Sequence, residues 1–375
     1  MMEKNSKIYV AGHLGLVGSA IWKNLQNKGY ANLIGKSVNK LNLLDQVATE
    51  NFFEQEKPEY VFLAAAKVGG IIANNTYRGE FIYENLTIQN NIIHNAWKYG
   101  VKKLLFLGST CIYPKQAPQP MKESYLLTSP LEYTNEPYAI AKIAGIKLCE
   151  SYNLQYGTNF ISVMPTNLYG PNDNFDLEKS HVLPALIRKI YLGNCLQQNN
   201  WYSIKADMAH LPIEGTDGNA SKEEILNILK KYGITPATKE EPTTVEIWGS
   251  GRPLREFLWS EEMADACVYL MENVNFKDIV SAMEESKSKE EKELNETRNT
   301  HINIGTGKDI SIKNLANLIC ETVGFEGELY FNESKPDGTI RKLTDVTKLH
   351  ELGWEHKIEI EEGVKKLYNW YTSQQ

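Results

Sequence analysis

The stretch VAGHLGLVGSA, residues 10–20, decides the fold of this chain. It ends a short apolar run, KIYVAG, and leads into the amphipathic stretch VGSAIWKNLQNKG. Gly12, Gly15 and Gly18 let a strand turn tightly into a helix while the backbone approaches a phosphate group. The free N–H groups at the helix N-terminus favour such an anion. The stretch therefore predicts a dinucleotide-binding βα unit, the alternative being a purely structural turn.

Short apolar runs alternate with longer amphipathic stretches through the first half of the chain. The runs KIYVAG, NLIGK, YVFLAAA, KKLLFLGS and NFISVMPT are typical of strands, several of them apolar throughout, as in a parallel sheet buried on both faces. The stretches between them, such as DQVATENFFEQ and FIYENLTIQNNIIHNAWKYG, have helical periodicity. Repeated βαβ units predict an α/β fold, a doubly wound parallel Rossmann sheet with a smaller C-terminal α/β substrate domain.

The pattern also suggests where the two domains divide. We expect residues 1–175 to form the Rossmann domain, with segments near 245–275 and 301–310 returning to it. Residues 176–375 should then form mainly the substrate domain.

Two polar stretches predict insertions in that second domain. In residues 196–243, Ser221 and Glu224 have the spacing of a capping box and Gly233 suits a helix C-terminus, so we expect one short surface helix on a loop. Residues 284–300, EESKSKEEKELNETRNT, are typical of a solvated helix or a mobile loop.

The composition argues against several classes of protein. The 375 residues are 42% hydrophobic and 23% charged, as in an ordinary globular protein, and the net charge of −7 argues against a nucleic-acid partner. Five cysteines without a C-x-x-C pair suggest neither a metal site nor a disulfide framework. The N-terminus has no apolar signal region and no 18-residue apolar span follows, so we expect a cytoplasmic protein that does not associate with a membrane.

The stretch NEPYAIAKIAG, residues 135–145, places Tyr138 and Lys142 four residues apart, on one face of a predicted helix. The ammonium would favour the ionised phenol and lower the pKa of Tyr138, which makes a proton donor usable near neutral pH. The alternative is a surface pair, because Tyr99 and Lys103 in KYGVKK have the same spacing.

Ser109 and Cys111 follow the predicted strand in LLFLGSTC. If the backbone stays extended, side chains two residues apart point to the same side. They would face the crevice beyond the strand ends, where doubly wound sheets bind ligands. The alternative for Cys111 is a small core residue.

The residues after the second predicted strand bear on the choice of dinucleotide. An NAD site usually places an acidic residue about 20 residues after the glycines. Here IGKSVNK has no acid, but it contains Lys36 and Lys40. Positive charge suits a 2′-phosphate, so we expect NADP(H); alternatively, these lysines only face solvent.

The same residues lie in a longer series of motifs: VAGHLGLVGSAI, LNLLD, AAAKVGGIIANN, KLLFLGSTCIYPK, NEPYAIAKIAGIKLCESYN, SVMPTNLYGPNDNF, HVLPALIRK, IWGSGRPLREFL, NIGTG and SKPDGTIRKL. Over nearly the whole chain the series resembles the extended short-chain dehydrogenase/reductases, and among them the GDP-L-fucose synthase family. That resemblance implies NADPH-dependent reduction at C4, with C3/C5 epimerisation, of a GDP-4-keto-6-deoxymannose-type sugar to GDP-L-fucose or a close analogue. The alternative is a C4-reductase, with or without epimerase activity, for a related GDP-4-keto sugar such as a GDP-4-keto-heptose in surface-glycan synthesis.

The resemblance also implies roles for individual residues. Tyr138 would protonate the C4 oxygen held by Ser109, and Lys142 would bind the nicotinamide ribose. Cys111 would be the base for epimerisation and His181 the opposing acid. The implied cofactor-binding residues are Gly12, His13, Gly15, Leu16, Val17, Gly18, Lys36, Asn42, Leu43, Ala64, Ala65, Leu107, Gly108, Lys142, Pro165, Asn167, Leu168 and His181. The implied substrate-binding residues are Ser109, Asn167, Val182, Lys189, Trp248, Arg255 and Asp337. A homodimer would form through the helices that contain ENLTIQNNIIHNAW and PYAIAKIAGIKLCESY.

Three positions depart from the family pattern. Leu14 and Val38 stand where the family usually has basic residues for the cofactor phosphate, so preference for NADPH over NADH would depend on Lys36 or Lys40. Lys189 replaces a usual arginine, which exchanges a two-pronged donor for a point charge.

Two further functions on this fold agree less well with the sequence. A 4,6-dehydratase on this scaffold would have an Asp-Glu pair after the serine or threonine, whereas STC has no carboxylate. A non-catalytic nucleotide sensor predicts a degraded catalytic set, but Ser109, Tyr138 and Lys142 are all present.

Overall fold

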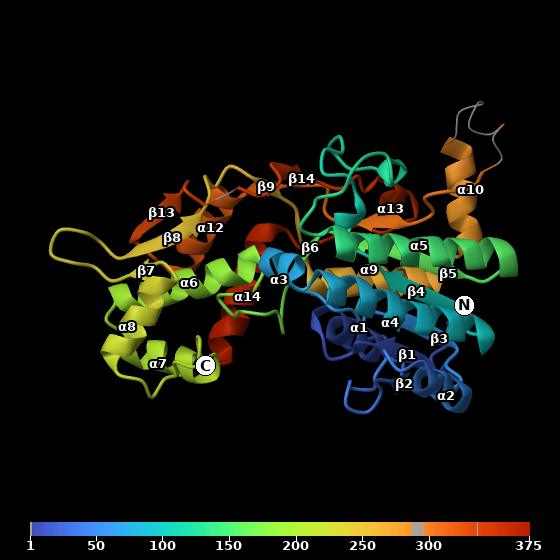
Figure 1. Cartoon of the computed structure of the whole chain (residues 1–375), viewed down its shortest axis with the longest axis horizontal. Helices are drawn as coiled ribbons and strands as arrows, with labels where there is room; N and C mark the ends of the chain where they lie inside the picture. Colours follow the sequence, from blue (N-terminus) through green and yellow to red (C-terminus); the bar gives the residue numbers. More distant parts are fainter. Residues whose placement is uncertain (1, 287–292, 294–295, 336) are drawn as a thin grey trace. The chain divides into compact units, whose positions relative to one another are not determined.

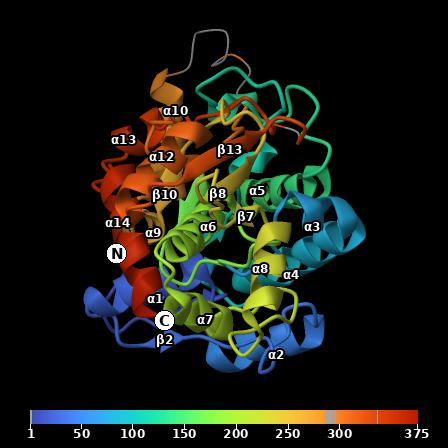
Figure 2. The same cartoon turned by 90° about the vertical axis from the view of Figure 1, so that its left-hand side faces the viewer.

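The computed structural model describes residues 2–286, 293, 296–335 and 337–375. The chain divides into two compact units, and Figures 1 and 2 label most of their helices and strands. The first unit consists of Met1–Leu168, Phe257–Lys308 and Leu343–Lys357, and the second of Tyr169–Glu256, Asp309–Lys342 and Ile358–Gln375. The helix or loop expected over residues 284–300 lies partly outside the described residues, which leave out 287–292, 294 and 295.

The first unit is built on a six-stranded parallel sheet, which confirms the predicted fold class. Its strand order is β11–β5–β4–β3–β1–β2. The strands are β1 (Ile8–Ala11), β2 (Leu33–Ile34), β3 (Tyr60–Leu63), β4 (Lys103–Leu107), β5 (Phe160–Pro165) and β11 (Ile302–Ile304). Because β2 and β3 flank β1 on opposite sides, the sheet has its topological switch point between β1 and β3, where such sheets bind ligands.

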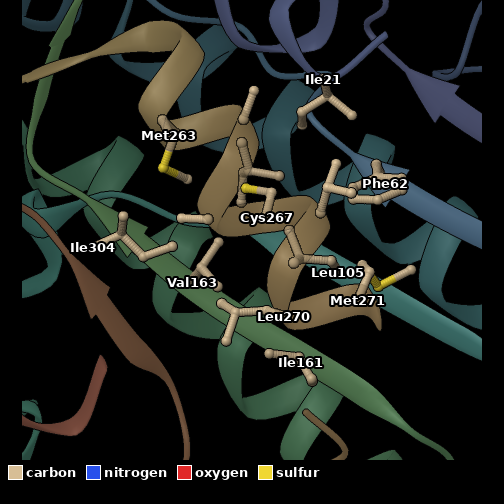
Figure 3. Packing of buried hydrophobic residues seen from close by; sticks show 14 of the residues in the cluster. Ile21, Phe62, Leu105, Ile161, Val163, Met263, Cys267, Leu270, Met271 and Ile304 are labelled. Carbon is tan, nitrogen blue, oxygen red and sulfur yellow. The ribbon is translucent and has the colours of Figure 1, made fainter. Parts of the chain in front are cut away.

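Helices cover both faces of this sheet. Helices α1 (Leu16–Asn27) and α9 (Ser260–Asn273) pack together on one face, and α2 (Gln46–Glu56), α4 (Arg78–Lys98) and α5 (Glu136–Tyr156) on the other. Figure 3 shows the first of these layers, in which Met263, Cys267 and Leu270 of α9 lie against Ile161 and Val163 of β5. All five side chains are buried, and each large apolar one contributes about 1.5–3 kcal/mol to folding.

Shorter elements complete the first unit. They are α3 (Ile71–Thr76), the 3-10 turns η1 (Thr110–Ile112) and η2 (Glu123–Tyr125), α10 (Phe276–Ser286) and α13 (Thr347–Glu351). A two-stranded ladder joins β6 (Asn167–Tyr169) to β10 (Phe257–Trp259).

The second unit has two small sheets and five helices among its described residues. One sheet has the order β13–β8–β7 and the other β12–β9–β14. These strands are β7 (Ile234–Thr235), β8 (Thr244–Trp248), β9 (Leu254–Arg255), β12 (Ile310–Ser311), β13 (Glu328–Asn332) and β14 (Arg341–Lys342). The helices are α6 (Val182–Gln197), α7 (Trp201–His210), α8 (Lys222–Lys231), α12 (Ile312–Val323) and α14 (Ile360–Ser373). Helix α6 packs against α7, α12 and β8.

The insertion at residues 196–243 differs from the prediction of one short surface helix. The predicted capping box of Ser221 and Glu224 begins α8, and Gly233 after it has a left-handed φ of +75°. A second helix, α7, was not predicted. It buries Asp207, which lies 2.9 Å from the guanidinium of buried Arg188. The insertion is therefore part of the packed interior of this unit.

Candidate active site

The glycine turn lies at the switch point of the sheet. Gly12 has a φ of +84°, and a Cβ atom there would lie 2.8 Å from the backbone nitrogen of Ala65, which follows β3. A Cβ atom at Gly18 would overlap the carbonyl oxygen of Gly12. Both positions therefore require glycine. Gly15, the N-cap of α1, has no side chain to cap the helix, and the first turn of α1 contains no acidic residue, so its N–H groups suit an anion.

His13 of the turn contacts α1 and the residue that follows β2. Its ring lies 5.4 Å from that of Trp22 in α1, and a Cβ atom at Gly35 would lie 2.5 Å from the same ring. Desolvation lowers the pKa of His13, which favours the neutral imidazole. Leu16 and Val17, the first residues of α1, are half-buried, whereas Leu14 is 69% exposed. The position where the family carries a basic residue thus presents an apolar side chain to solvent.

The expected phosphate-binding lysines differ in their surroundings. Lys36 Nζ lies 3.4 Å from Glu56 Oε1, while Lys40 is exposed. Val38 between them is 71% exposed. The pairing with Glu56 partly neutralises Lys36, whereas the charge of Lys40 faces solvent.

The next two implied cofactor residues are fixed by hydrogen bonds. The side chain of Asn42 accepts a 3.1 Å hydrogen bond from the backbone N–H of Leu44. The carbonyl of Leu43 accepts a 2.9 Å hydrogen bond from Asn91 Nδ2. Ala64 and Ala65, after β3, are half-buried. The ends of β1 and β3 therefore present mostly backbone and small side chains, as close approach of a dinucleotide requires.

Tyr138 and Lys142 lie on one face of α5. Lys142 Nζ donates a 2.8 Å hydrogen bond to the carbonyl of Leu107, the last residue of β4. The same nitrogen lies 5.6 Å from the centre of the Tyr138 ring. The similarly spaced Tyr99 and Lys103 differ, because Lys103 belongs to β4 and donates to the carbonyls of Leu270 and Met271, both at 2.8 Å. Only the first pair reaches the carboxyl end of β4.

The pKa values at this pair differ from the expectation that Lys142 would lower the pKa of Tyr138. Tyr138 is half-buried, and desolvation raises its pKa above the ordinary value; a negative charge at Cys111 would raise it further. Burial also lowers the pKa of Lys142 to about 8. Tyr138 therefore keeps its proton at neutral pH, as a proton donor must.

The expected extended backbone from Ser109 to Cys111 is also wrong. Ser109 is extended, with φ −164° and ψ 149°, but the 3-10 turn η1 begins at Thr110. The backbone N–H of Cys111 donates a 3.3 Å hydrogen bond to Ser109 Oγ, so the turn brings the Ser109 hydroxyl to the backbone of Cys111. Helix α5 packs against η1, and the charge at Cys111 acts on both Tyr138 and Lys142.

The remaining implied cofactor residues of the first unit surround the ends of β4 and β5. Gly108 continues β4 and its N–H donates 2.8 Å to the carbonyl of Val163. Pro165 ends β5 and is buried, whereas Asn167 in β6 is exposed and Leu168 is half-buried.

The second unit holds His181, Val182 and Lys189 on or next to α6. His181 is the N-cap of α6 and is exposed; desolvation nevertheless lowers its pKa. Val182 is the first residue of the helix. Lys189 Nζ donates 2.6 Å to the carbonyl of Glu246 in β8, and burial lowers the pKa of Lys189 to about 8.

Trp248, Arg255 and Asp337 lie on the strands and loops of the same unit. Trp248 ends β8, is 58% exposed, and has Lys335 Nζ 5.1 Å from the centre of its ring. Arg255 is half-buried and donates 2.7 Å to the carbonyl of Leu254. Asp337 accepts from the N–H and hydroxyl of Ser250 at 2.8 and 2.7 Å, which lowers its pKa and keeps it ionised. An exposed indole, cations and a carboxylate are the groups that a nucleotide needs.

Two side chains near the catalytic set were not singled out from the sequence. Phe81 of α4 is buried and meets the Tyr138 ring edge-on, with centroids 6.4 Å apart. Tyr113, two residues after Cys111, is buried against β11. Neither has a sequence signal beyond an aromatic residue in an apolar setting, although Tyr113 belongs to the quoted motif KLLFLGSTCIYPK.

Neither a metal-binding cluster nor a membrane-spanning helix is found in the described part of the chain. No group of three or more His, Cys, Asp or Glu side chains there could hold a metal ion. Within the same residues, no helix combines the length and the apolar character needed to cross a membrane.

Comparison with known proteins places the chain in a family. The model of the NAD dependent epimerase/dehydratase family matches residues 8–210 and 218–282. GDP-L-fucose synthase 1 of Arabidopsis thaliana is 48% identical, over 99% of this chain and 94% of the relative. A solved GDP-6-OMe-4-keto-L-xylo-heptose reductase from Campylobacter jejuni is 46% identical, with a TM-score of 0.88, over 100% of this chain and 99% of the other. The GDP-mannoheptose C4 reductase from C. jejuni, solved with NADP bound, is 45% identical, with a TM-score of 0.84 and 99% of both chains covered. The chain thus belongs to the NAD dependent epimerase/dehydratase family, within the extended short-chain dehydrogenase/reductases.

Proposed function

We propose that the protein is an NADPH-dependent enzyme that reduces the C4 ketone of a GDP-linked 4-keto sugar. The observation that carries this proposal is the hydrogen bond from Lys142 to Leu107, which places the Tyr138–Lys142 pair at the carboxyl end of β4 beside Ser109. With a GDP-4-keto-6-deoxymannose-type substrate, epimerisation at C3 and C5 precedes reduction and gives GDP-L-fucose or a close analogue. The C. jejuni reductases favour a second candidate substrate, a GDP-4-keto-heptose, which the same residues would reduce.

In the reduction, Tyr138 donates the proton that the C4 oxygen needs. Its raised pKa keeps it protonated until negative charge develops on that oxygen. The Ser109 hydroxyl donates a second hydrogen bond to the same oxygen. Lys142, held by Leu107, supplies positive charge beside the tyrosine as its proton leaves.

In the epimerisation, the ketone acidifies the protons on C3 and C5, and two groups exchange them. Cys111 is proposed as the base, since the thiolate is the reactive form of cysteine. His181 is proposed as the acid that delivers a proton to the opposite face of the ring. Its pKa is lowered in the free protein, but the negative charge of a bound pyrophosphate favours the protonated imidazole.

The first unit is proposed to bind NADP(H), which when bound supplies the hydride for C4. The N–H groups of the glycine turn and the N-terminus of α1 would hold the pyrophosphate. The lack of room for a Cβ atom at Gly12 and Gly18 supports this. Lys36 or Lys40 would meet the 2′-phosphate. The cofactor-binding residues expected from the family resemblance are proposed to complete the site.

The second unit is proposed to bind the GDP moiety. Lys189 and Arg255 would neutralise the pyrophosphate, and Trp248 would stack on guanine or close over it. Asp337, ionised and exposed, would accept from a ribose hydroxyl or a guanine N–H. Val182 and Asn167 would complete the contacts.

A cytoplasmic homodimer is proposed, with α4 and α5 as the contact. Their outer surfaces expose large apolar residues, namely Tyr83 at 66%, Ile140 at 39% and Leu154 at 56%. Such a face suits a two-fold interface, in which the same patch meets its copy. Sedimentation of the purified protein would distinguish a dimer from a monomer.

A substrate panel tests the proposed activity. The protein is incubated with NADPH and, separately, GDP-4-keto-6-deoxymannose and a GDP-4-keto-heptose, and loss of nicotinamide absorbance is followed. The stereochemistry of each product is read by NMR, with Tyr138→Phe as the inactive control. NADPH consumption with at least one ketone supports the proposal, and none with either would refute it.

A further inference from the structure

The turn that carries Ser109 and Cys111 is tied to the outermost strand of the sheet by one side chain. Tyr113 directly follows η1 as its C-cap and is 3% exposed. Its hydroxyl donates 2.5 Å to Asn303 Oδ1 and lies 3.1 Å from His301 Nε2. Asn303 belongs to β11 and His301 directly precedes it. The phenol of Tyr113 is therefore an anchor between η1 and β11.

The hydrogen-bond partners fix the direction of each bond in this anchor. Asn303 Nδ2 donates to the carbonyls of Met121 and Asp345, at 2.9 and 3.1 Å, so the amide oxygen must face Tyr113. The Tyr113 proton goes to that oxygen, and His301 Nε2 must then carry a proton and donate it. Burial lowers the pKa of His301 well below its usual value, which leaves the neutral imidazole that this arrangement requires.

A second layer of buried contacts holds the anchor in place. The backbone N–H of Asn303 donates 3.1 Å to Glu123 Oε1, and Lys348 Nζ lies 3.8 Å from the same oxygen. Lys348 also donates to the carbonyls of Asn299 and His301, at 3.1 and 3.0 Å. Glu123, His301 and Asn303 are buried and hydrogen-bonded within this network, which favours a single geometry, although His301 Nδ1 has no partner among the described residues.

The turn η1 also contacts the catalytic helix. Helix α5 packs against η1, and Tyr113, next to the turn, is bonded to β11, so both elements restrain this segment. We propose that Tyr113, bonded to His301 and Asn303, is a positioning residue that fixes Cys111 and Ser109 relative to Tyr138. The inference rests on the proposed catalytic roles of those three residues, and Tyr113 itself does not touch the substrate.

The test compares two buried tyrosines that lose the same atom. Tyr113→Phe removes the anchor, while Tyr30→Phe removes a hydroxyl that is also buried and bonded, to Glu272 Oε1 at 2.6 Å and to the carbonyl of Met2 at 3.3 Å. Three quantities are measured for each variant: thermal stability, the rate of Cys111 alkylation by iodoacetamide read on its peptide by mass spectrometry, and solvent deuterium entry into the sugar.

Loosening the turn exposes the half-buried thiol, so Tyr113→Phe should speed Cys111 alkylation at least about threefold at pH 8. It should slow deuterium entry at least ~10-fold, because small misplacement of a reacting group costs much rate. Tyr30→Phe should leave both rates within about twofold of the unaltered protein.

Unchanged alkylation in Tyr113→Phe, or an equal change in Tyr30→Phe, would overturn the positioning role. The alkylation arm does not need turnover, so failure of the proposed reaction is seen separately as absent deuterium entry in the unaltered protein. Should Tyr113→Phe not fold, His301→Phe removes the other donor of the anchor while keeping a ring. A smaller increase in alkylation is then expected, because the bond from Tyr113 to Asn303 remains, and no increase counts against the proposal.

Discussion

The ammonium of Lys142 donates a 2.8 Å hydrogen bond to the carbonyl of Leu107, which joins the catalytic helix α5 to the end of strand β4. Lys142 is only 3% exposed, so this single acceptor replaces most of its hydration. A buried ammonium with one carbonyl partner is costly for folding. Such a cost is expected at a site whose geometry serves chemistry.

Replacement of Tyr138 by phenylalanine tests the proton donor. The change removes one oxygen and keeps the ring that Phe81 contacts edge-on, so the fold should be unaffected. Loss of a general acid typically costs ~100-fold or more, and we expect kcat for ketone reduction to fall by at least that factor. NADPH affinity, measured by fluorescence titration, should change little. Tyr99→Phe is the matched control, and normal turnover by Tyr138→Phe would contradict the assignment.

Replacement of Lys142 by methionine tests the cost of its burial. Because the folded pKa is about 8 against an ordinary 10.5, the unfolded chain binds more protons between these pH values, and stability rises with pH across that window. At pH 7 the burial of the charged form opposes folding, so Lys142→Met should be more stable there, by up to about 3 kcal/mol. This advantage should shrink from pH 8 to 10.5.

Urea unfolding at several pH values measures that difference for Lys142→Met. Lys103 and Lys189 also have a pKa of about 8, but both are present in the variant and cancel in the comparison. Lys366→Met, in an exposed pair with Glu362, is the control and should show no such trend. A stability difference independent of pH would show that Lys142 is not buried as an ammonium.

The two epimerisation groups are tested by deuterium exchange. Cys111→Ser and His181→Gln should each stop solvent deuterium from entering C3 and C5 of a GDP-4-keto-6-deoxymannose, because each removes one of the two proton-transfer groups. Exchange is read by NMR without NADPH, so that reduction does not remove the ketone. Undiminished exchange in both variants would remove these roles. No exchange in the unaltered protein would make it a reductase only.

Cofactor preference is tested at the end of β2. NADPH should bind more tightly than NADH, and the double change Lys36→Ala with Lys40→Ala should cost at least ~10-fold in NADPH affinity while leaving NADH affinity unchanged. Since Glu56 lies 3.4 Å from Lys36, Glu56→Gln should strengthen NADPH binding. Calorimetric titration measures all of these. Equal dissociation constants for the two cofactors in the unaltered protein would mean that Leu14 and Val38 had removed the preference.

Much of the first unit could be predicted because its signals are local. Apolar runs such as YVFLAAA mark buried parallel strands, and β3 is indeed buried along its whole length. The glycine turn, the capping box at Ser221 and Glu224, and the α/β fold class follow from backbone preferences that act over a few residues.

What the sequence did not reveal depends on contacts between distant segments. Helix α7 is mixed in polarity, and from the sequence its Asp207 resembles a surface residue. In the fold Asp207 is buried and is neutralised by Arg188, 19 positions earlier. The chain has a turn at Thr110–Ile112, where the sequence predicts an extended backbone from Ser109 to Cys111. The raised pKa of Tyr138 comes from burial, which residue spacing does not report.

The buried ion pair of Arg188 and Asp207 leads to a prediction about the stability of the fold. Both side chains are at most 1% exposed, and the guanidinium also donates 3.2 Å to the carbonyl of Phe175. Asp207 further accepts from the hydroxyl of Tyr371 in α14, so it joins α6, α7 and the C-terminal helix.

Removing one partner of a buried pair leaves an uncompensated charge, which costs about 3–5 kcal/mol. Asp207→Asn should therefore lower the free energy of unfolding by about that amount, whereas Glu362→Gln at the exposed pair with Lys366 should change it by under about 1 kcal/mol. Equal urea midpoints for the two variants would mean that the inserted helix α7 adds no stability through this pair.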